Sequence, residues 1–351
     1  MERLIRECFT EEGYIFATKA VDIARKLGHT RLARLASNES PFPPSQNAIT
    51  AAKDELETVN RYPDERMESL IKSLRKYHGE YRFVTGVGMD GVIETIIRMF
   101  IGQGDRVAIS TPTFSFYGIA SKAQGGELTL IPRRDDFSVD IEDFIRKSEG
   151  AKLSFICSPN NPTGNATPPE DIEYILEHID GLLFLDNAYV EFCDYDYRPL
   201  MDRYRNLVIG RTMSKAFSLA GLRVGYAFVP PWLEPYYWRA ATPFTLNSVS
   251  AMAAAGALSD KDHVMKIVQH VRTWRARYLE EIPYTSFPSD ANFVMVDVAP
   301  HNAEDVVLEL ARKGIIVRSC TSFPGLEEHY IRVGIGEDWE CERFLEEIRT
   351  L

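Results

Sequence analysis

The sequence predicts an α/β fold with a large domain, built on a mostly parallel seven-stranded sheet, and a smaller α+β domain. Between about residues 80 and 230, short apolar β-branched runs alternate with segments of helical period, which is typical of repeated β-α units. One long segment of helical period follows, and strand and helix patterns are mixed after it. A length of 351 residues also allows one large domain plus a smaller one.

Seven runs are predicted to form the large sheet. They are apolar throughout, as expected of strands that helices cover on both faces. Thr167-Pro168-Pro169-Glu170 has the pattern of a capping box with proline at the first helical position, and it precedes a predicted helix over Asp171–Ile179. Another helix, with a wide apolar face, is predicted after Gly91. The strand candidates are Arg82–Thr85, Val107–Ser110, Leu128–Ile131, Leu153–Cys157, Leu182–Leu185, Leu207–Ile209 and Gly225–Val229.

The C-terminal part of the chain predicts a separate compact unit. From Asp262 to Glu281, apolar residues recur every three or four positions, which indicates one long helix linking two domains. We expect residues 1–40 to pack on the other domains, residues 41–260 to form the large domain, and residues 261–351 to form the small one. The elements predicted after the long helix are a strand over Asn292–Val298, a helix over Ala303–Lys313, strands over Ile315–Arg318 and Tyr330–Val333, and a helix over Trp339–Thr350.

Composition excludes several classes of protein. With 45% hydrophobic residues the chain is not disordered, and a net charge of −11 argues against a nucleic-acid partner, because phosphate binding needs a basic surface. The five cysteines are scattered with no C-x-x-C pair, and the histidines lack the spacing of metal ligands, so we expect no disulfide framework and no metal. No stretch has the about 18 apolar residues of a membrane span, and the N-terminus lacks the core of a secretory signal. We therefore expect a cytoplasmic protein without a membrane partner.

A glycine-rich segment, Gly86-Val-Gly88-Met-Asp-Gly91, matches the dinucleotide fingerprint G-x-G-x-x-G. A nicotinamide site also needs an acidic residue at the end of the second strand, and here that strand ends Ser110-Thr-Pro-Thr113. The exposed N–H groups of a helix start still favour a phosphate, whatever molecule carries it. The alternative is a glycine turn with no ligand.

Three further segments carry polar side chains after predicted strands. Lys215 lies among small residues, with Arg223 eight residues later as a fork for an anion. Asp186 ends an apolar strand, at the edge of an α/β sheet where ligands bind, and Asn161 lies in a proline-rich loop. Taken alone, Lys215 is compatible with a surface lysine, Asp186 with the cap of a turn or helix, and Asn161 with a turn that binds no ligand. Together they match what pyridoxal phosphate requires: a lysine for its aldehyde, an acid for its ring nitrogen, and an arginine with amides for its phosphate.

On these motifs the sequence resembles the fold-type I pyridoxal phosphate-dependent aminotransferases, and within them the histidinol-phosphate aminotransferase family. The resemblance runs from Tyr14 to about Gly336. Gly91 and Asn187 depart from it, because the family usually has an acidic residue at each position. The strongest matches are Ser158–Gly164, Arg211–Arg223 and Asn60–Asp64, while Leu35–Pro41 also favours the narrower family.

The resemblance implies a role for each matching residue. Lys215 would be the Schiff-base lysine, Asp186 the partner of the pyridinium nitrogen, and Tyr189 a further catalytic residue that hydrogen-bonds the ring hydroxyl. The cofactor-binding residues would be Gly88, Met89, Asp90, Phe114, Asn161, Asp186, Tyr189, Thr212, Ser214, Lys215 and Arg223, with Tyr62 reaching the phosphate in the neighbouring subunit. The substrate-binding residues would be Tyr14, Asn38, Asn161, Arg318 and Arg332.

The resemblance also implies an activity: transfer of an amino group from histidinol phosphate to 2-oxoglutarate, giving imidazole acetol phosphate and glutamate, in histidine biosynthesis. The partners would be a small amino donor, a 2-oxo acid and a second copy of the chain in a homodimer with shared sites. An aromatic or other amino-acid aminotransferase, or a threonine-phosphate decarboxylase of the same fold, would share the cofactor residues. A nicotinamide dehydrogenase and a catalytically silent binding protein are alternatives of other classes.

Overall fold

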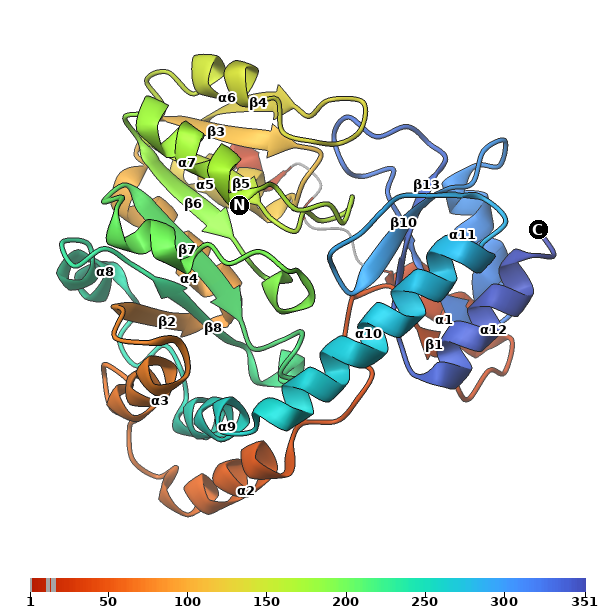
Figure 1. Ribbon diagram of the computed structural model, residues 1–351, viewed down its shortest axis with the longest axis horizontal. Helices are drawn as coiled ribbons and strands as arrows, with labels where there is room; N and C mark the ends of the chain where they lie inside the picture. The colour runs from red at the N-terminus through yellow and green to blue at the C-terminus, as the bar shows by residue number, and fades with distance from the viewer. Residues whose placement is uncertain (1, 11–12, 14–16) are drawn as a thin grey trace.

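The computed structural model describes residues 2–10, 13 and 17–351. Its largest feature is a seven-stranded sheet with the strand order β2-β8-β7-β6-β5-β3-β4 (Figure 1). The predicted α/β class is therefore confirmed, and each of the seven predicted strands lies in this sheet. The strands are β2 (Phe83–Val87), β3 (Arg106–Thr111), β4 (Glu127–Pro132), β5 (Leu153–Cys157), β6 (Leu182–Asp186), β7 (Leu207–Thr212) and β8 (Val224–Phe228).

The sheet is mostly parallel, as predicted, and β8 is the strand that runs against its neighbours. β3, β4, β5, β6 and β7 pair in parallel, whereas β8 is antiparallel to both β2 and β7. A parallel neighbour needs a crossover of a dozen or more residues, usually a helix. The connection from β7 to β8 contains only the 3-10 turn Ala220–Leu222, so the chain returns in the opposite direction.

One strand departs from the predicted burial. β4 is an edge strand of the sheet, and Leu130 on it is 45% exposed. The expectation that every strand is covered on both faces is wrong for β4, on which Ile131 alone is buried, whereas the other edge strand, β2, is buried along most of its length.

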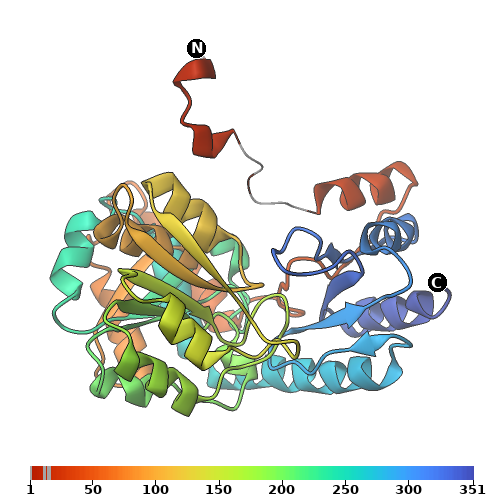
Figure 2. The same ribbon diagram turned by 90° about the horizontal axis from the view of Figure 1, so that it is seen from above.

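Helices cover both faces of the large sheet (Figures 1 and 2). On one face α4 (Gly88–Phe100) packs on β2, β7 and β8 and contacts α5 (Phe116–Gln124) and α8 (Glu234–Ala240). On the other face α6 (Ile141–Lys147) contacts α7 (Pro169–His178). The predicted apolar face of α4 is buried, with Val92, Ile93 and Ile96 each 0% exposed.

Two predicted helix starts need correction. α4 begins at Gly88 rather than after Gly91, so the glycine-rich segment forms its first turn. The capping box predicted at Thr167 does not form: Pro168 is the N-cap residue of α7, and the buried Thr167 hydroxyl has no hydrogen-bond partner within the residues that the structure describes. The predicted proline in the first turn is present as Pro169.

The long predicted helix is α10 (Lys261–Glu281), and it runs from the large-sheet unit along the C-terminal unit (Figure 1). The C-terminal unit holds a four-stranded antiparallel sheet with the order β12-β13-β10-β9. The strand predicted over residues 315–318 is interrupted at Val317 and forms two short strands. The elements of this unit are β9 (Thr285–Ser286), β10 (Phe293–Asp297), α11 (Ala303–Arg312), β11 (Ile315–Ile316), β12 (Arg318–Ser319), β13 (Tyr330–Gly334) and α12 (Asp338–Ile348).

The first forty residues contact both units. α1 (Thr18–Lys26) packs on α11, and β1 (Ala33–Arg34) pairs in parallel with β11 (Figure 2). The 3-10 turn Glu7–Phe9 contacts α5 of the large-sheet unit. Domain boundaries at residues 40 and 260 stay a prediction. In the large-sheet unit α2 (Gln46–Glu55) and α3 (Glu68–His78) pack on α9 (Ser248–Leu258). None of the helices in the described ranges has the length and apolarity to cross a membrane.

Candidate active site

A cavity of 570 Å³ lies where the carboxyl ends of the large-sheet strands face the C-terminal sheet. All but three of the sixteen predicted site residues line it, and both units contribute. The predicted residues in its lining are Asn38, Met89, Asp90, Phe114, Asn161, Asp186, Tyr189, Thr212, Ser214, Lys215, Arg223, Arg318 and Arg332. Residues that the sequence prediction did not name line it too, among them Ser37, Glu39, Phe116 and Cys157.

Asp186 is the last residue of β6 and is 2% exposed. One carboxylate oxygen accepts the backbone N–H of Ala188 at 2.9 Å, and the other accepts the hydroxyl of Tyr117. Burial raises the pKa of Asp186 to about 6, because a charge is less well solvated away from water, while these two donors lower it. Because Asp186 lines the cavity, its carboxylate can pair with a cation that is bound there.

Lys215 follows β7 and points into the same cavity. Its Nζ donates to the carbonyl oxygen of Ser37 at 3.0 Å. Burial lowers the pKa of this amine to about 8, helped by the positive charge of Arg332 and opposed by Glu39. Near neutral pH the uncharged fraction of Lys215 is therefore larger than that of an exposed lysine, and the uncharged amine is the form that acts as nucleophile or base.

An anion cradle lies at the start of α4. Gly88 has a φ of +66°, and its N–H donates to the carbonyl oxygen of Arg223 at 2.7 Å. The Arg223 guanidinium bonds the carboxylate of Asp90 at 2.7 Å, and both side chains are nearly half exposed. The hydroxyls of Thr212 and Ser214 hydrogen-bond each other at 2.9 Å. A helix N-terminus, a guanidinium and two hydroxyls together favour a phosphate group.

Two arginines face the cavity from the C-terminal sheet. Arg318 on β12 and Arg332 on β13 are register partners, and both are buried. Arg332 donates to the side-chain oxygen of Asn161 and, at 2.6 Å, to the carbonyl oxygen of Ala36, while its buried Nε has no partner in the described part of the chain. Arg318 donates to the hydroxyl of Ser322 at 3.0 Å. This pair is suited to an anionic substrate group, since each guanidinium can donate two parallel hydrogen bonds to a carboxylate or a phosphate.

Residues Leu35 to Glu39 connect the two halves of the cavity. Leu35 donates its backbone N–H to Ile316 and accepts that of Gly334. Asn38, with a φ of +51°, donates its side-chain amide to the hydroxyl of Tyr189 at 3.1 Å. Burial raises the pKa of Tyr189, which keeps this hydroxyl neutral at the cavity wall.

Three predicted residues do not line the cavity. Gly88 lies beside it and contacts Arg223. Tyr62 is 82% exposed and stacks on Phe244, with ring centroids 4.6 Å apart, so it is directed to solvent in this chain. Tyr14 falls outside the described residues.

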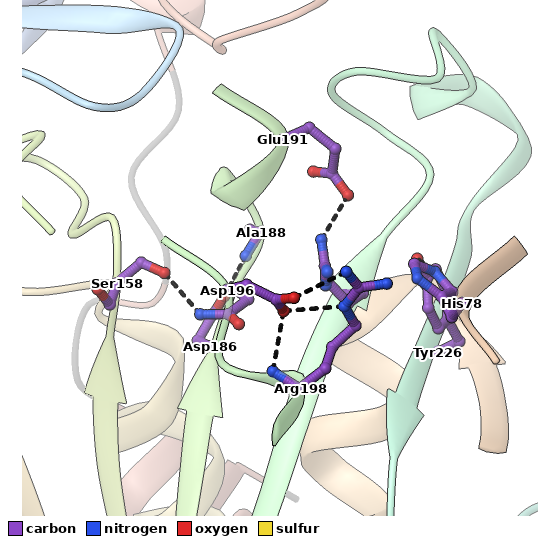
Figure 3. A network of polar contacts seen from close by, with 10 residues as sticks. His78, Ser158, Asp186, Ala188, Glu191, Asp196, Arg198 and Tyr226 are labelled. Carbon is purple, nitrogen blue, oxygen red and sulfur yellow. Dashed lines mark hydrogen bonds and ion pairs between the residues drawn. The ribbon is translucent and has the colours of Figure 1, made fainter. Parts of the chain in front are cut away.

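Figure 3 shows a network of polar contacts that includes Ser158, Asp186, Glu191 and Arg198. Asn187, where the resembled family usually has an acid, is buried and donates to the carbonyl oxygen of Ser158 at 2.7 Å, so it supports the loop that carries Asn161. Arg211 and Glu191 form a buried ion pair at 2.8 Å. His78 is buried, and burial lowers its pKa to about 2. Its Nε2 is 2.8 Å from the hydroxyl of Tyr226, and its Nδ1 has no partner among the described residues.

Some site groups were missed by sequence reasoning. The carbonyl oxygens of Ala36 and Ser37 gave no signal, because any residue type supplies one. Tyr117 gave no specific signal either, because in the sequence it looks like one more apolar residue of a helix. Glu39 was the residue that could have been found, since it is next to the predicted Asn38.

Comparison with known proteins places this chain in a family. Residues 30–348 match the family described as aminotransferase class I and II. The chain therefore belongs to the class I and II aminotransferases. It is 65% identical over 352 residues to the histidinol-phosphate aminotransferase of Methanoculleus marisnigri, covering 100% of both chains, and 56% identical over 344 residues to that of Methanosphaerula palustris, covering 97% of both.

A solved structure agrees. The crystal structure of histidinol-phosphate aminotransferase from Sinorhizobium meliloti in complex with pyridoxal 5'-phosphate matches with a TM-score of 0.88 at 25% identity, covering 99% of this chain and 98% of that one. Within its class the chain belongs to the histidinol-phosphate aminotransferase family.

Proposed function

We propose that this chain is a pyridoxal phosphate-dependent aminotransferase that converts histidinol phosphate and 2-oxoglutarate into imidazole acetol phosphate and glutamate in histidine biosynthesis. The observation that carries the proposal is the 65% identity, over the full length of both chains, to a histidinol-phosphate aminotransferase. The cavity supports it, because Lys215 and Asp186 line one space together with an anion cradle and two arginines. A nicotinamide dehydrogenase would need neither the lysine nor the paired arginines.

The residues present fit pyridoxal phosphate. Among the described residues no cation is bonded to the buried carboxylate of Asp186, which suits a protonated ring nitrogen. The start of α4 together with Arg223, Thr212 and Ser214 suits the phosphate, and the uncharged fraction of Lys215 suits the aldehyde. When bound, the group supplies an electron sink that weakens the Cα–H bond of an amino substrate.

The side chains of the protein then have separate tasks. Lys215 Nζ takes the proton from the substrate Cα, a general-base step typically worth about 10²–10⁴-fold in rate. Asp186 holds a proton on the ring nitrogen through its negative charge. Asn161 and Tyr189 place amide and hydroxyl donors at the cavity wall, and Phe114 offers an aromatic face.

Both substrates are anions of different shape, one a phosphate monoester and the other a dicarboxylate. Arg332 and Arg318 lie on adjacent strands and can bind either, because a guanidinium fork matches both groups. Binding both substrates at one arginine pair is what allows one cavity to serve the two halves of the reaction.

We further propose that the protein is a homodimer with Tyr62 completing the cradle of the partner's site. The support is that Tyr62 is 82% exposed and stacks on the exposed Phe244, and that Leu56 and Val59, close to it in the sequence, are exposed as well. Such a patch on a chain surface favours an interface between copies. A cytoplasmic location and the absence of a nucleic-acid partner stay predictions from the sequence.

The activity test uses the purified protein loaded with pyridoxal phosphate. We expect histidinol phosphate to convert the visible absorbance of the cofactor to that of its amine form in a single turnover, and 2-oxoglutarate to restore it. Lys215→Ala should bind the cofactor without this conversion. Conversion by aromatic amino acids with none by histidinol phosphate, or release of carbon dioxide from threonine phosphate, would overturn the proposal.

The dimer test mixes two inactive variants, Tyr62→Ala and Lys215→Ala. A shared site restores activity in the mixed dimer, because one of its two sites then has both residues intact. No recovery after mixing, or sedimentation of the wild-type chain as a monomer, would overturn the shared site.

A further inference from the structure

We propose that Tyr117, which lies outside the cavity, is a positioning residue that fixes the carboxylate of Asp186 and keeps it in its anionic form for the cofactor ring. The inference rests on the proposed function. Tyr117 touches neither substrate nor cofactor in this assignment, since it is absent from the cavity lining and acts through Asp186.

The geometry leaves Asp186 little freedom. Its two carboxylate oxygens accept hydrogen bonds from different parts of the chain. One accepts from the backbone N–H of Ala188, two residues further along, and the other accepts from the hydroxyl of Tyr117 on α5. With each oxygen held by one donor, the carboxylate cannot rotate without breaking a buried hydrogen bond. Loss of such a bond to a charged group is costly, because the group has no water to replace it.

Tyr117 is itself held in place. It is 0% exposed, and its ring stacks on Phe155 of β5 with centroids 4.7 Å apart and an interplanar angle of 7°. Phe114 packs edge-on against it at 5.5 Å. Burial and the nearby charge of Asp186 raise the pKa of Tyr117, so its hydroxyl remains a donor throughout the working pH range.

The Tyr117 hydroxyl is one of the groups around Asp186 that favour its anionic form. Burial and the like charge of Asp90 on α4 favour the neutral acid, whereas Lys215, Ala188 and Tyr117 favour the anion. Cys157 on β5, the register partner of Asp186, is a buried neutral thiol. Before the cofactor binds, Tyr117 is therefore the side chain that holds Asp186 ionised by a direct hydrogen bond.

The test measures the affinity of the apoprotein for pyridoxal phosphate as a function of pH. In the wild type we expect affinity to rise as Asp186 ionises near pH 6 and again as Lys215 loses its proton near pH 8. Tyr117→Phe keeps the stacked ring and removes the donor. We expect its lower midpoint to move to higher pH and its dissociation constant at pH 6 to rise about tenfold, with the upper midpoint unchanged.

Matched variants separate positioning from packing. Tyr237→Phe removes another fully buried hydroxyl, which donates to the carbonyl oxygen of Thr85 at 3.0 Å, and it should leave both midpoints unchanged. In an Asp186→Asn background, Tyr117→Phe should change the affinity less than twofold, because there is no longer a carboxylate to hold. 3-Fluorotyrosine placed at position 117, a stronger donor of nearly the same size, should move the lower midpoint to lower pH.

The outcomes are distinct. If Tyr117→Phe and the fluorinated variant both keep the wild-type midpoints, the inference on Tyr117 is wrong and the proposed function stands. If Tyr117→Phe does not fold, the fluorinated protein decides alone. If the wild-type apoprotein binds no pyridoxal phosphate at any pH, the proposed function itself is overturned, and the inference with it.

Discussion

Replacing Glu191 with alanine should destabilise the protein more than removal of an exposed acid. Glu191 pairs with Arg211 at 2.8 Å, and the two side chains are 9% and 10% exposed. Removing one member of a buried ion pair costs about 3–5 kcal/mol, because the other charge stays buried without a partner. No second acidic side chain bonds Arg211 within the described ranges, and its Nε already lacks a partner, so we expect at least about 3 kcal/mol.

The control is Glu309→Ala. Glu309 pairs with Arg312 at 2.6 Å one helical turn away, but the two side chains are 41% and 57% exposed. Water and salt screen such a pair, so its loss should cost about 0.5 kcal/mol or less.

The assay is urea unfolding followed by both tryptophan fluorescence and circular dichroism, since coincident transitions are needed before a free energy is derived. A loss of about 3 kcal/mol lowers the urea midpoint by about 1 M for a slope near 3 kcal/mol/M. A loss below about 1 kcal/mol in Glu191→Ala, equal to that in Glu309→Ala, would refute the reasoning. It would show that the Arg211 charge finds water or another partner when Glu191 is absent.

Three further predictions concern the cavity directly. Arg332→Lys should raise the KM for both the amino donor and the oxo acid about tenfold, because an ammonium is only a point charge, and unchanged steady-state kinetics for both would remove Arg332 from the substrate site. Lys215→Met should stabilise the apoprotein at pH 7 and should not stabilise it above about pH 10.5. Because the pKa of Lys215 is lowered to about 8, the native wild-type protein loses stability as the pH falls from 10.5 to 8. Thermal unfolding measured over a series of pH values checks this sign. Gly225→Ala should weaken cofactor binding and lower Tm, because the added methyl group would lie within 3.0 Å of the backbone of Gly88. The control is Gly102→Ala, whose methyl group meets only an ordinary contact at 3.5 Å. Equal Tm values for the two variants would contradict the prediction.

Much of the fold and site could be predicted because the polar residues follow strands. Asp186 and Asn161 come at or just after the ends of parallel strands, and such ends meet at one edge of a sheet. Their convergence with Lys215 in one cavity therefore follows from chain order and strand direction. Arg332 came from the family resemblance, since its strand belongs to a different sheet.

The remainder depends on tertiary contacts that no local pattern carries. The partner of Asp186 on α5, Tyr117, looks in sequence like one more apolar helix residue. The capping box at Thr167 matched a pattern that the helix did not use, because Pro168 took the N-cap position. The role of Asn187, which supports a neighbouring loop through a carbonyl oxygen, could not be predicted from a position where the family has an acid.

The length of α10 sets the distance between two parts of the proposed active site. This single helix of 21 residues continues from the unit that carries Lys215 into the unit that carries Arg332 (Figure 1). Each residue of a helix adds about 1.5 Å and turns the chain by about 100°. Deleting one residue from its middle would shift and rotate Arg318 and Arg332 relative to Lys215, so the helix length sets the distance between the proposed anion-binding arginines and the proposed base.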